Sequence, residues 1–128
     1  MINITQIFIS DNNQEMSLRL KNNSAKIKEL FPDHNYHLYN NDSIEELLLE
    51  NFDKKIIHTY RRIKPYSYKC DFARYCILYI KGGWYFDLGL QVVRGLKLND
   101  NTSLLVFRDI NKYAKVSWAC ASGIIYAQ

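Results

Sequence analysis

A helix-like segment that runs directly into an apolar strand-like segment is the feature that most constrains the fold. Residues 68–81 carry apolar side chains at helical spacing. Gly82 and Gly83 follow, and a glycine pair at this place is typical of a left-handed helix stop. Residues 84–90 (WYFDLGL) are apolar except for Asp87, which predicts a buried strand. A helix that feeds a buried strand through so short a turn is expected in a layered α/β domain.

The rest of the chain alternates between the same two kinds of segment. Strands are expected at residues 4–10, 36–39, 104–108 and 116–121. Helices are expected at residues 14–30, where Asn22 and Asn23 weaken the middle, and at 42–49, with a helix or turn at 53–63. On the helix over 68–81 the expected apolar face is Phe72, Cys76 and Tyr79. This order predicts an α/β class with a mainly parallel central sheet, in one domain over residues 1–128.

Composition and charge exclude several classes of protein. Among the 128 residues, 48% are hydrophobic and 23% charged, which excludes a disordered chain or a coiled coil. The net charge of +4 suits an anionic small ligand, an anionic membrane surface or nucleic acid, but no nucleic-acid-binding module is recognisable. No signal peptide or membrane-spanning run is evident, and the three cysteines match no disulfide framework. We therefore expect a cytoplasmic protein that does not bind nucleic acid.

The candidate site is a group of charged residues around the apolar strand. Asp87 lies near the carboxyl end of that strand, where α/β sheets place their ligand crevices. Asp71 and Arg74 lie on the helix that leads into it, three residues apart and on one side. The alternative is purely structural: a helical ion pair worth about 0.3–0.5 kcal/mol, with Asp87 as a satisfied core residue. Residue chemistry alone leaves both interpretations open.

Two other groups carry weaker signals. His34 and His37 are three residues apart, but they lie on a loop-to-strand stretch without carboxylates at ligand spacing, which argues against zinc. Near Cys70 and Cys76 only Lys69 and Arg74 could lower a thiol pKa, which argues against nucleophilic catalysis. The aromatic residues at 84–86 are expected in the core rather than against a ligand.

The stretch KCDFARYCILYIKGGWYFDLGL resembles the signature of the glycosyltransferases with a DXD sugar-binding region. That group includes capsule and lipopolysaccharide glycosyltransferases, yeast-type α-mannosyltransferases and the clostridial glucosylating toxins. ITQIFISD resembles the first strand of these enzymes, and FPDHNYHLYNND resembles a later segment. The resemblance can be followed over residues 4–96.

The resemblance implies a GT-A fold, a Rossmann-like sandwich, and transfer of a sugar with retention from a nucleotide-diphosphate sugar, commonly UDP-linked, to a glycan or other acceptor. It also implies a role in polysaccharide synthesis and, as is usual in the family, the use of Mn²⁺ or Mg²⁺. By position, Phe8 matches the aromatic residue that stacks on the base. Asp71 and Arg74 match the pair that holds the hydroxyls of the donor sugar and the phosphate side of the donor. Asp87 matches the first Asp of the DXD motif.

The chain departs from the family pattern at the metal. Gly89 stands where the motif has its second Asp, the usual direct metal ligand, so Asp87 remains as a weak, indirect one. Hard cations prefer several oxygen ligands, which puts Mn²⁺ or Mg²⁺ binding in doubt. Phosphate charge would then be met by Arg74 or by a basic run that is otherwise a solvated face: Arg61, Arg62, Lys64 and Lys69.

A second departure concerns the carboxyl-terminal stretch. SWACASGIIYAQ resembles a strand pair that the family normally continues with a hundred or so further residues. We therefore expect a GT-A-like domain that is incomplete at its C-terminus, with an open sheet edge that favours self-association. Two functions follow: a glycosyltransferase, or a degenerate or truncated relative that only binds the nucleotide sugar.

Overall fold

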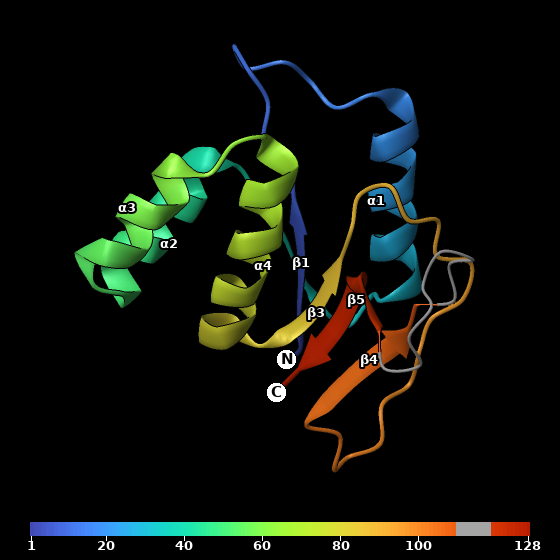
Figure 1. The fold of residues 1–128 in the computed structure, drawn as a ribbon. Helices are drawn as coiled ribbons and strands as arrows, with labels where there is room; N and C mark the ends of the chain where they lie inside the picture. The colour runs from blue at the N-terminus through green and yellow to red at the C-terminus, as the bar shows by residue number, and fades with distance from the viewer. Residues whose placement is uncertain (110–118) are drawn as a thin grey trace.

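The computed structural model describes residues 1–109 and 119–128 (Figure 1). Five strands form one sheet in the order β2-β1-β3-β5-β4. The strands are β1 (Asn3–Ile7), β2 (Asn35–Tyr39), β3 (Gly83–Phe86), β4 (Leu104–Arg108) and β5 (Cys120–Ala127). The helices are α1 (Leu18–Leu30), α2 (Asn41–Asn51), α3 (Lys54–Arg62) and α4 (Tyr66–Lys81).

The sheet combines a parallel half with an antiparallel half. Strand β1 pairs in parallel with β2 and with β3. Parallel neighbours need a crossover, and α1 supplies it between β1 and β2 while α2, α3 and α4 supply it between β2 and β3. Strand β5 pairs antiparallel with β3 and with β4. The expected α/β class with a parallel core of strands is confirmed, and β5 and β4 extend that core into a mixed sheet.

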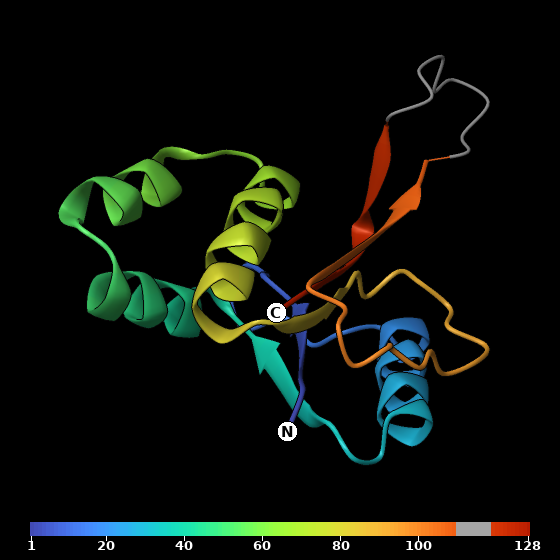
Figure 2. The same ribbon diagram turned by 90° about the horizontal axis from the view of Figure 1, so that it is seen from below.

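Each face of the sheet has its own hydrophobic cluster. Helix α1 covers one face, and α4 with α2 and α3 covers the other (Figures 1 and 2). Successive residues of a strand point to opposite faces, so Trp84 and Phe86 join the cluster under α1 while Tyr85 joins the one under α4. All three aromatic side chains are buried, which confirms that they belong to the core.

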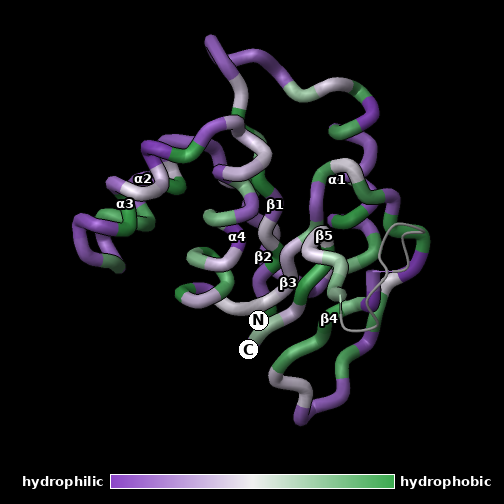
Figure 3. The backbone as a smooth tube through the Cα atoms, viewed as in Figure 1, coloured by the Kyte–Doolittle hydropathy of each residue, from purple (hydrophilic) through white to green (hydrophobic). Residues whose placement is uncertain are grey.

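Helix α1 is shorter than predicted but unbroken. The Ser17 hydroxyl accepts a hydrogen bond from the Leu20 amide at 3.4 Å and caps the helix, which therefore begins at Leu18 rather than near Gln14. Asn23 does not interrupt it, because its side-chain amide points into the core and donates to the Leu88 carbonyl at 2.8 Å. The connection between β1 and α1 is mostly hydrophilic and lies beyond the carboxyl end of β1 (Figure 3).

Helix α4 begins at Tyr66, two residues before the predicted start, and turns a different face inward. The predicted apolar face was wrong at Tyr79, whose side chain is 81% exposed. The buried positions are Ala73, Arg74, Ile77 and Leu78. Small Ala73, one turn before Ile77, lets the helix backbone approach the sheet closely.

The two glycines after α4 are required by the backbone. Gly82 and Gly83 have φ values of 60° and 94°, in the region that side chains disfavour. A Cβ at Gly83 would stand 2.2 Å from the Asn3 carbonyl oxygen of β1. The predicted helix stop is confirmed, and Gly83 also allows β3 to pair with β1.

The ends of two other strands also differ from prediction. Strand β3 ends at Phe86 rather than at residue 90, so Asp87 follows the strand directly. The last predicted strand, 116–121, begins at Cys120 among the described residues and continues to Ala127, while 116–118 lie outside them. No helix of the described ranges is long and apolar enough to cross a membrane.

Candidate functional site

The candidate site lies at the edge of the sheet where the parallel strands end. Parallel pairing brings the carboxyl ends of β1, β2 and β3 to this edge, and α4 begins there because it runs back against β3. Asp87 is the first residue after β3, and its backbone N–H donates to the Gly123 carbonyl of β5 at 2.8 Å. The backbone at this position is thus tied to the next strand.

The structure brings together the three charged residues that the sequence singles out. Asp71 and Arg74 lie one turn apart on α4, and the Arg74 Nη2 donates to Asp71 Oδ1 at 2.6 Å. The same nitrogen is 3.4 Å from Oδ1 of Asp87, which arrives from β3. Hereafter these three residues are called the carboxylate cluster. One cation lies between two carboxylates, so the cluster has one negative charge in excess.

The Arg74 guanidinium is locked in place. Its Nε donates to the Cys70 carbonyl at 3.4 Å, and its Nη1 donates to the carbonyl and hydroxyl oxygens of Ser122 at 2.5 and 3.2 Å. The group also stacks on the Tyr85 ring, with the guanidinium carbon 4.6 Å from the ring centre. All three nitrogens therefore have an acceptor within the protein. This arrangement orients the two carboxylates and leaves Arg74 few donors for a ligand.

Tyr85 holds Asp87 from the other side. Its hydroxyl donates to Asp87 Oδ1 at 2.7 Å. Burial raises the pKa of Tyr85 well above its ordinary value, and the neighbouring negative charge of Asp87 raises it further. The phenol therefore stays protonated near neutral pH and remains a donor to this carboxylate.

The two carboxylates are open to solvent although their cation is not. The side chains of Asp71 and Asp87 are 53% and 43% exposed, whereas the Arg74 side chain is 5% exposed. Each carboxylate places Oδ1 against the arginine and has a second oxygen for other partners. The cluster can thus accept hydrogen bonds from hydroxyl groups of a bound molecule.

The loop after Asp87 is supported by residues from distant elements. Leu88 is buried, and Asn23 of α1 donates to its carbonyl. Gly89 is exposed, and a Cβ there would meet nothing within 4 Å. A Cβ at Gly123 would stand 2.7 Å from Asp87 Oδ2, so a larger residue in β5 would push the Asp87 carboxylate aside.

Sequence reasoning missed the supports of the cluster. The sequence patterns place Tyr85 in the core alone and indicate no part in the site for Ser122, Gly123 or Asn23. A glycine inside the apolar run of β5 is the one local signal, because it often marks close approach by another group. The partners of Arg74 and Leu88 depend on tertiary contacts across 48 and 65 residues, which no local pattern reveals.

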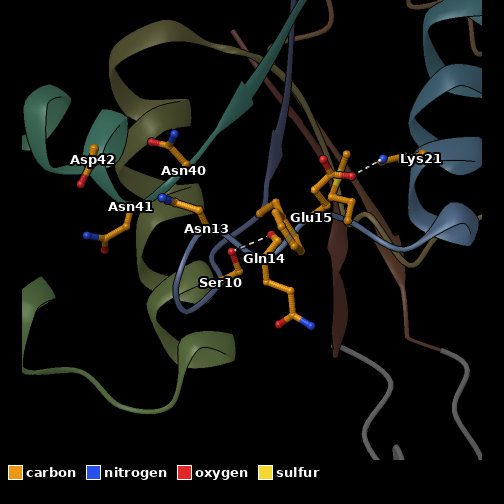
Figure 4. Close-up of a pocket in the computed structure, with 10 residues that line it drawn as sticks. Ser10, Asn13, Gln14, Glu15, Lys21, Asn40, Asn41 and Asp42 are labelled. Carbon is orange, nitrogen blue, oxygen red and sulfur yellow. Dashed lines mark hydrogen bonds and ion pairs between the residues drawn. The ribbon is translucent and has the colours of Figure 1, made fainter.

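Phe8 lies at the same edge of the sheet but in a separate pocket. It follows β1 and its amide donates to the Tyr39 carbonyl of β2 at 2.9 Å. The pocket beside it measures about 580 Å³ and is rich in amide side chains (Figure 4). No member of the carboxylate cluster lines it. Its polar lining residues are Ser10, Asn13, Gln14, Glu15, Lys21, Asn40, Asn41 and Asp42.

The residues at the site do not by themselves fit a divalent cation. Both carboxylates direct Oδ1 at Arg74, and Gly89 offers no side-chain oxygen. Among the described residues, no group of three or more His, Cys, Asp and Glu side chains is placed to hold a metal ion. A hard cation here would need most of its oxygen ligands from a bound molecule.

A thiol nucleophile is also disfavoured at this edge. Cys70 lies one turn before Arg74, and burial raises the pKa of its thiol more than the Arg74 charge lowers it. Burial likewise raises the pKa of Cys76. The reactive thiolate is therefore scarce at neutral pH.

Comparisons with known proteins bear on the family and the fold of the chain. Residues 17–105 match the family described as "Glycosyltransferase sugar-binding region containing DXD motif". An uncharacterized glycosyltransferase from Acanthamoeba polyphaga mimivirus is 42% identical over 58 residues, which are 45% of this chain and 23% of the viral protein. The solved PaToxG glycosyltransferase superimposes with a TM-score of 0.74 at 18% identity, over 98% of this chain and 54% of that one.

These matches differ in what they establish. The structural likeness at 18% identity shows the fold, which is that of a glycosyltransferase. This chain spans about a quarter of the viral relative and about half of the solved protein. The family match covers more than half of the chain and includes all three residues of the carboxylate cluster. The chain therefore belongs to the glycosyltransferase family that is defined by the sugar-binding region with the DXD motif.

Proposed function

We propose that this chain binds the donor of a sugar-transfer reaction, a nucleoside-diphosphate sugar. The observation that carries the proposal is the carboxylate cluster, in which a buried arginine presents two half-exposed carboxylates at the end of β3. Sugars offer neighbouring hydroxyl groups, and a carboxylate oxygen accepts a hydrogen bond from each of them. Asp71 and Asp87 would accept from the hydroxyls of the sugar, and Asp87 from those of the ribose.

The nucleoside would occupy the pocket beside Phe8. Its aromatic ring offers a face for stacking, worth about 1–3 kcal/mol per base in nucleic-acid complexes. The amides of Asn13, Asn40 and Asn41 carry both donors and acceptors, which suits the edge of a base such as uracil. The pocket and the carboxylate cluster lie at one edge of the sheet, so a single extended donor would reach both.

Arg74 acts here as a positioning residue. The resemblance to the family had suggested contact with the phosphate side of the donor, but the three guanidinium nitrogens already have acceptors. Holding Asp71 and Asp87 in one orientation lowers the ordering cost of binding a sugar between them.

A second candidate function is donor binding without transfer. Gly89 favours it, because the motif's second carboxylate is absent and the remaining residues do not fit a cation. The leaving nucleoside diphosphate gains negative charge in the transition state, and groups that neutralise this charge speed its departure. Without that help, the chain would bind the donor and turn it over slowly.

Calorimetric titration with a panel of nucleotide sugars, with and without Mn²⁺, tests the proposal. We expect binding of at least one UDP-linked sugar, and weaker binding in Asp71→Asn. The matched control is Asp100→Asn on an exposed loop, which should bind like the parent. A well-folded sample that binds no nucleotide sugar would overturn the proposal. Release of product in the presence of a glycan acceptor would favour the enzyme over the binding module.

A further inference from the structure

The positive charge of the chain is concentrated in one short segment. Residues 54–69 contain six Lys and Arg and no Asp or Glu. The whole chain has 17 basic and 13 acidic residues, so the remainder carries 11 basic and 13 acidic ones and is negative. The segment comprises α3 and the start of α4, and α3 lies farther from the sheet than α4 does (Figures 1 and 2). The positive net charge of the chain therefore comes from this segment.

A pocket of about 460 Å³ lies within this segment, between the end of α3 and the start of α4. Its lining residues are Arg61, Lys64, Pro65, Tyr66 and Lys69. Three of the five are cations and none is acidic. We call this pocket the basic corner.

The cations of the basic corner are only partly neutralised. Arg61 donates from Nε to Glu45 of α2 at 2.9 Å, and its side chain remains 55% exposed. The Lys69 ammonium lies 4.4 Å from the centre of the Tyr60 ring, which attracts it without cancelling its charge. Lys64 is exposed and has no ion-pair partner within the part of the chain that the structure describes.

The basic corner is separate from the carboxylate cluster. Lys69 and Asp71 are two residues apart on α4, which places them about 200° apart around the helix axis. The contacts agree, because Lys69 packs against Tyr60 of α3 while Asp71 binds Arg74. The start of α4 adds to the positive potential, since Pro65 provides no side-chain cap for its amides.

We propose that the basic corner is a second binding site, which takes a phosphate group through Lys64 and Lys69 with help from Arg61. A phosphate monoester carries between one and two negative charges at neutral pH and three acceptor oxygens, which matches several donors around one hollow. The phosphate belongs either to a soluble molecule or to a lipid headgroup. The site does not depend on the proposed donor function.

The experiment uses two phosphate probes and two matched double variants. Pyrophosphate is titrated into the ¹⁵N-labelled chain and followed by amide chemical shifts, and phosphatidylcholine vesicles with and without phosphatidic acid are used for co-sedimentation. Lys64→Gln/Lys69→Gln removes two charges from the basic corner. Lys54→Gln/Lys55→Gln removes two charges from the start of α3, and neither residue lines the pocket. Lys64→Gln alone, at an exposed side chain, is the fallback if the first double variant fails to fold.

We expect shifts at the amides of 61–69 with pyrophosphate, or sedimentation only with phosphatidic acid. The first result identifies a soluble phosphate and the second a lipid headgroup. In either arm, loss of both lysines of the basic corner should weaken binding about tenfold, as expected for charge-assisted hydrogen bonds, and the control pair should change it much less. Equal weakening by both double variants would show diffuse charge attraction and overturn the site. Binding in neither arm would overturn it too.

Discussion

The carboxylate cluster and the basic corner use the same helix, α4, in opposite ways. In the cluster, one cation is buried between two carboxylates that stay half-exposed. In the basic corner, three cations surround an open pocket, and among the residues that the structure describes only Arg61 of the three has an acidic partner. A buried cation fixes its carboxylates as oriented acceptors for neutral hydroxyls, whereas exposed cations attract anions from solution. On this difference we base the two proposals, a sugar at the carboxylate cluster and a phosphate group at the basic corner.

Removal of Arg74 should have the largest effect on stability, because it takes away the cation that lies between the two carboxylates. Arg74→Ala leaves two carboxylates facing each other and a hole in a buried position. We expect a loss of about 2–4 kcal/mol in the free energy of unfolding, below the range for a fully buried pair because both carboxylates are partly solvated. Urea denaturation measures it. Arg19→Ala on the exposed side of α1 is the control, and equal stability of the two variants would contradict a structural role for this ion pair.

The next effect concerns what the cluster recognises. Asp87→Asn removes the charge but keeps the shape, so hydroxyl groups lose a charged acceptor. We expect affinity for a nucleotide sugar to fall by about 1.5–3 kcal/mol. Affinity for the bare nucleoside monophosphate should fall less, because only the ribose contact of Asp87 is weakened there. Calorimetry with both ligands measures the two changes. An equal loss for both would show that Asp87 contacts the nucleotide rather than the sugar.

Restoring the missing carboxylate at position 89 should raise the affinity for Mn²⁺ by a moderate amount. A Cβ at Gly89 meets no atom within 4 Å, so Gly89→Asp is accommodated without strain. Adding a second charged oxygen ligand beside Asp87 should tighten Mn²⁺ binding about tenfold, measured by calorimetry in the presence of nucleoside diphosphate. Gln91→Asp, two residues further on, adds the same charge as a control. Tight Mn²⁺ binding by the parent chain would show that other ligands already suffice.

The smallest effect concerns the tyrosine that holds Asp87. Tyr85→Phe removes one hydrogen bond, which should cost about 1 kcal/mol of unfolding free energy at neutral pH. Burial raises the pKa of Tyr85 in the folded state above the unfolded value of about 10. The unfolded chain therefore loses this proton first, and the stability is lost as pH rises above 10.

Stability measured at neutral and at alkaline pH separates these two contributions. The parent should lose more unfolding free energy than Tyr85→Phe between pH 7 and about pH 11. Tyr79→Phe, at a side chain that is 81% exposed, serves as the control and should follow the parent. The same pH dependence in all three proteins would contradict the effect of burial on Tyr85.

The sequence predicted the fold well where the signals are local. The Gly82 and Gly83 stop, the aromatic strand after it and the alternation of strands and helices need only short-range patterns. The exposed Tyr79 could not be predicted, because helical spacing alone gives several apolar faces and only packing against the sheet selects one. The start of α1 depended on which of several polar residues became its cap.

The candidate site was predicted in part. Asp71 and Arg74 are helical neighbours, and Asp87 follows the next strand, so their convergence could be inferred from spacing and strand direction. The hydrogen bonds from Arg74 to Ser122 could not, since β5 reaches the site by antiparallel pairing with β3. The basic run at 61–69 was visible as charge, but its closure into a pocket depends on how α3 meets α4.

Amide chemical shifts during titration of the ¹⁵N-labelled chain with a UDP-linked sugar test the central claim most directly. We predict shifts at residues 71 and 74 of α4, at 87–90 after β3 and at 122–123 of β5, with those at 61–69 nearly unchanged. Perturbation confined to the basic corner, or none at the carboxylate cluster in a sample that binds the ligand, would contradict the assignment of the sugar to Asp71 and Asp87.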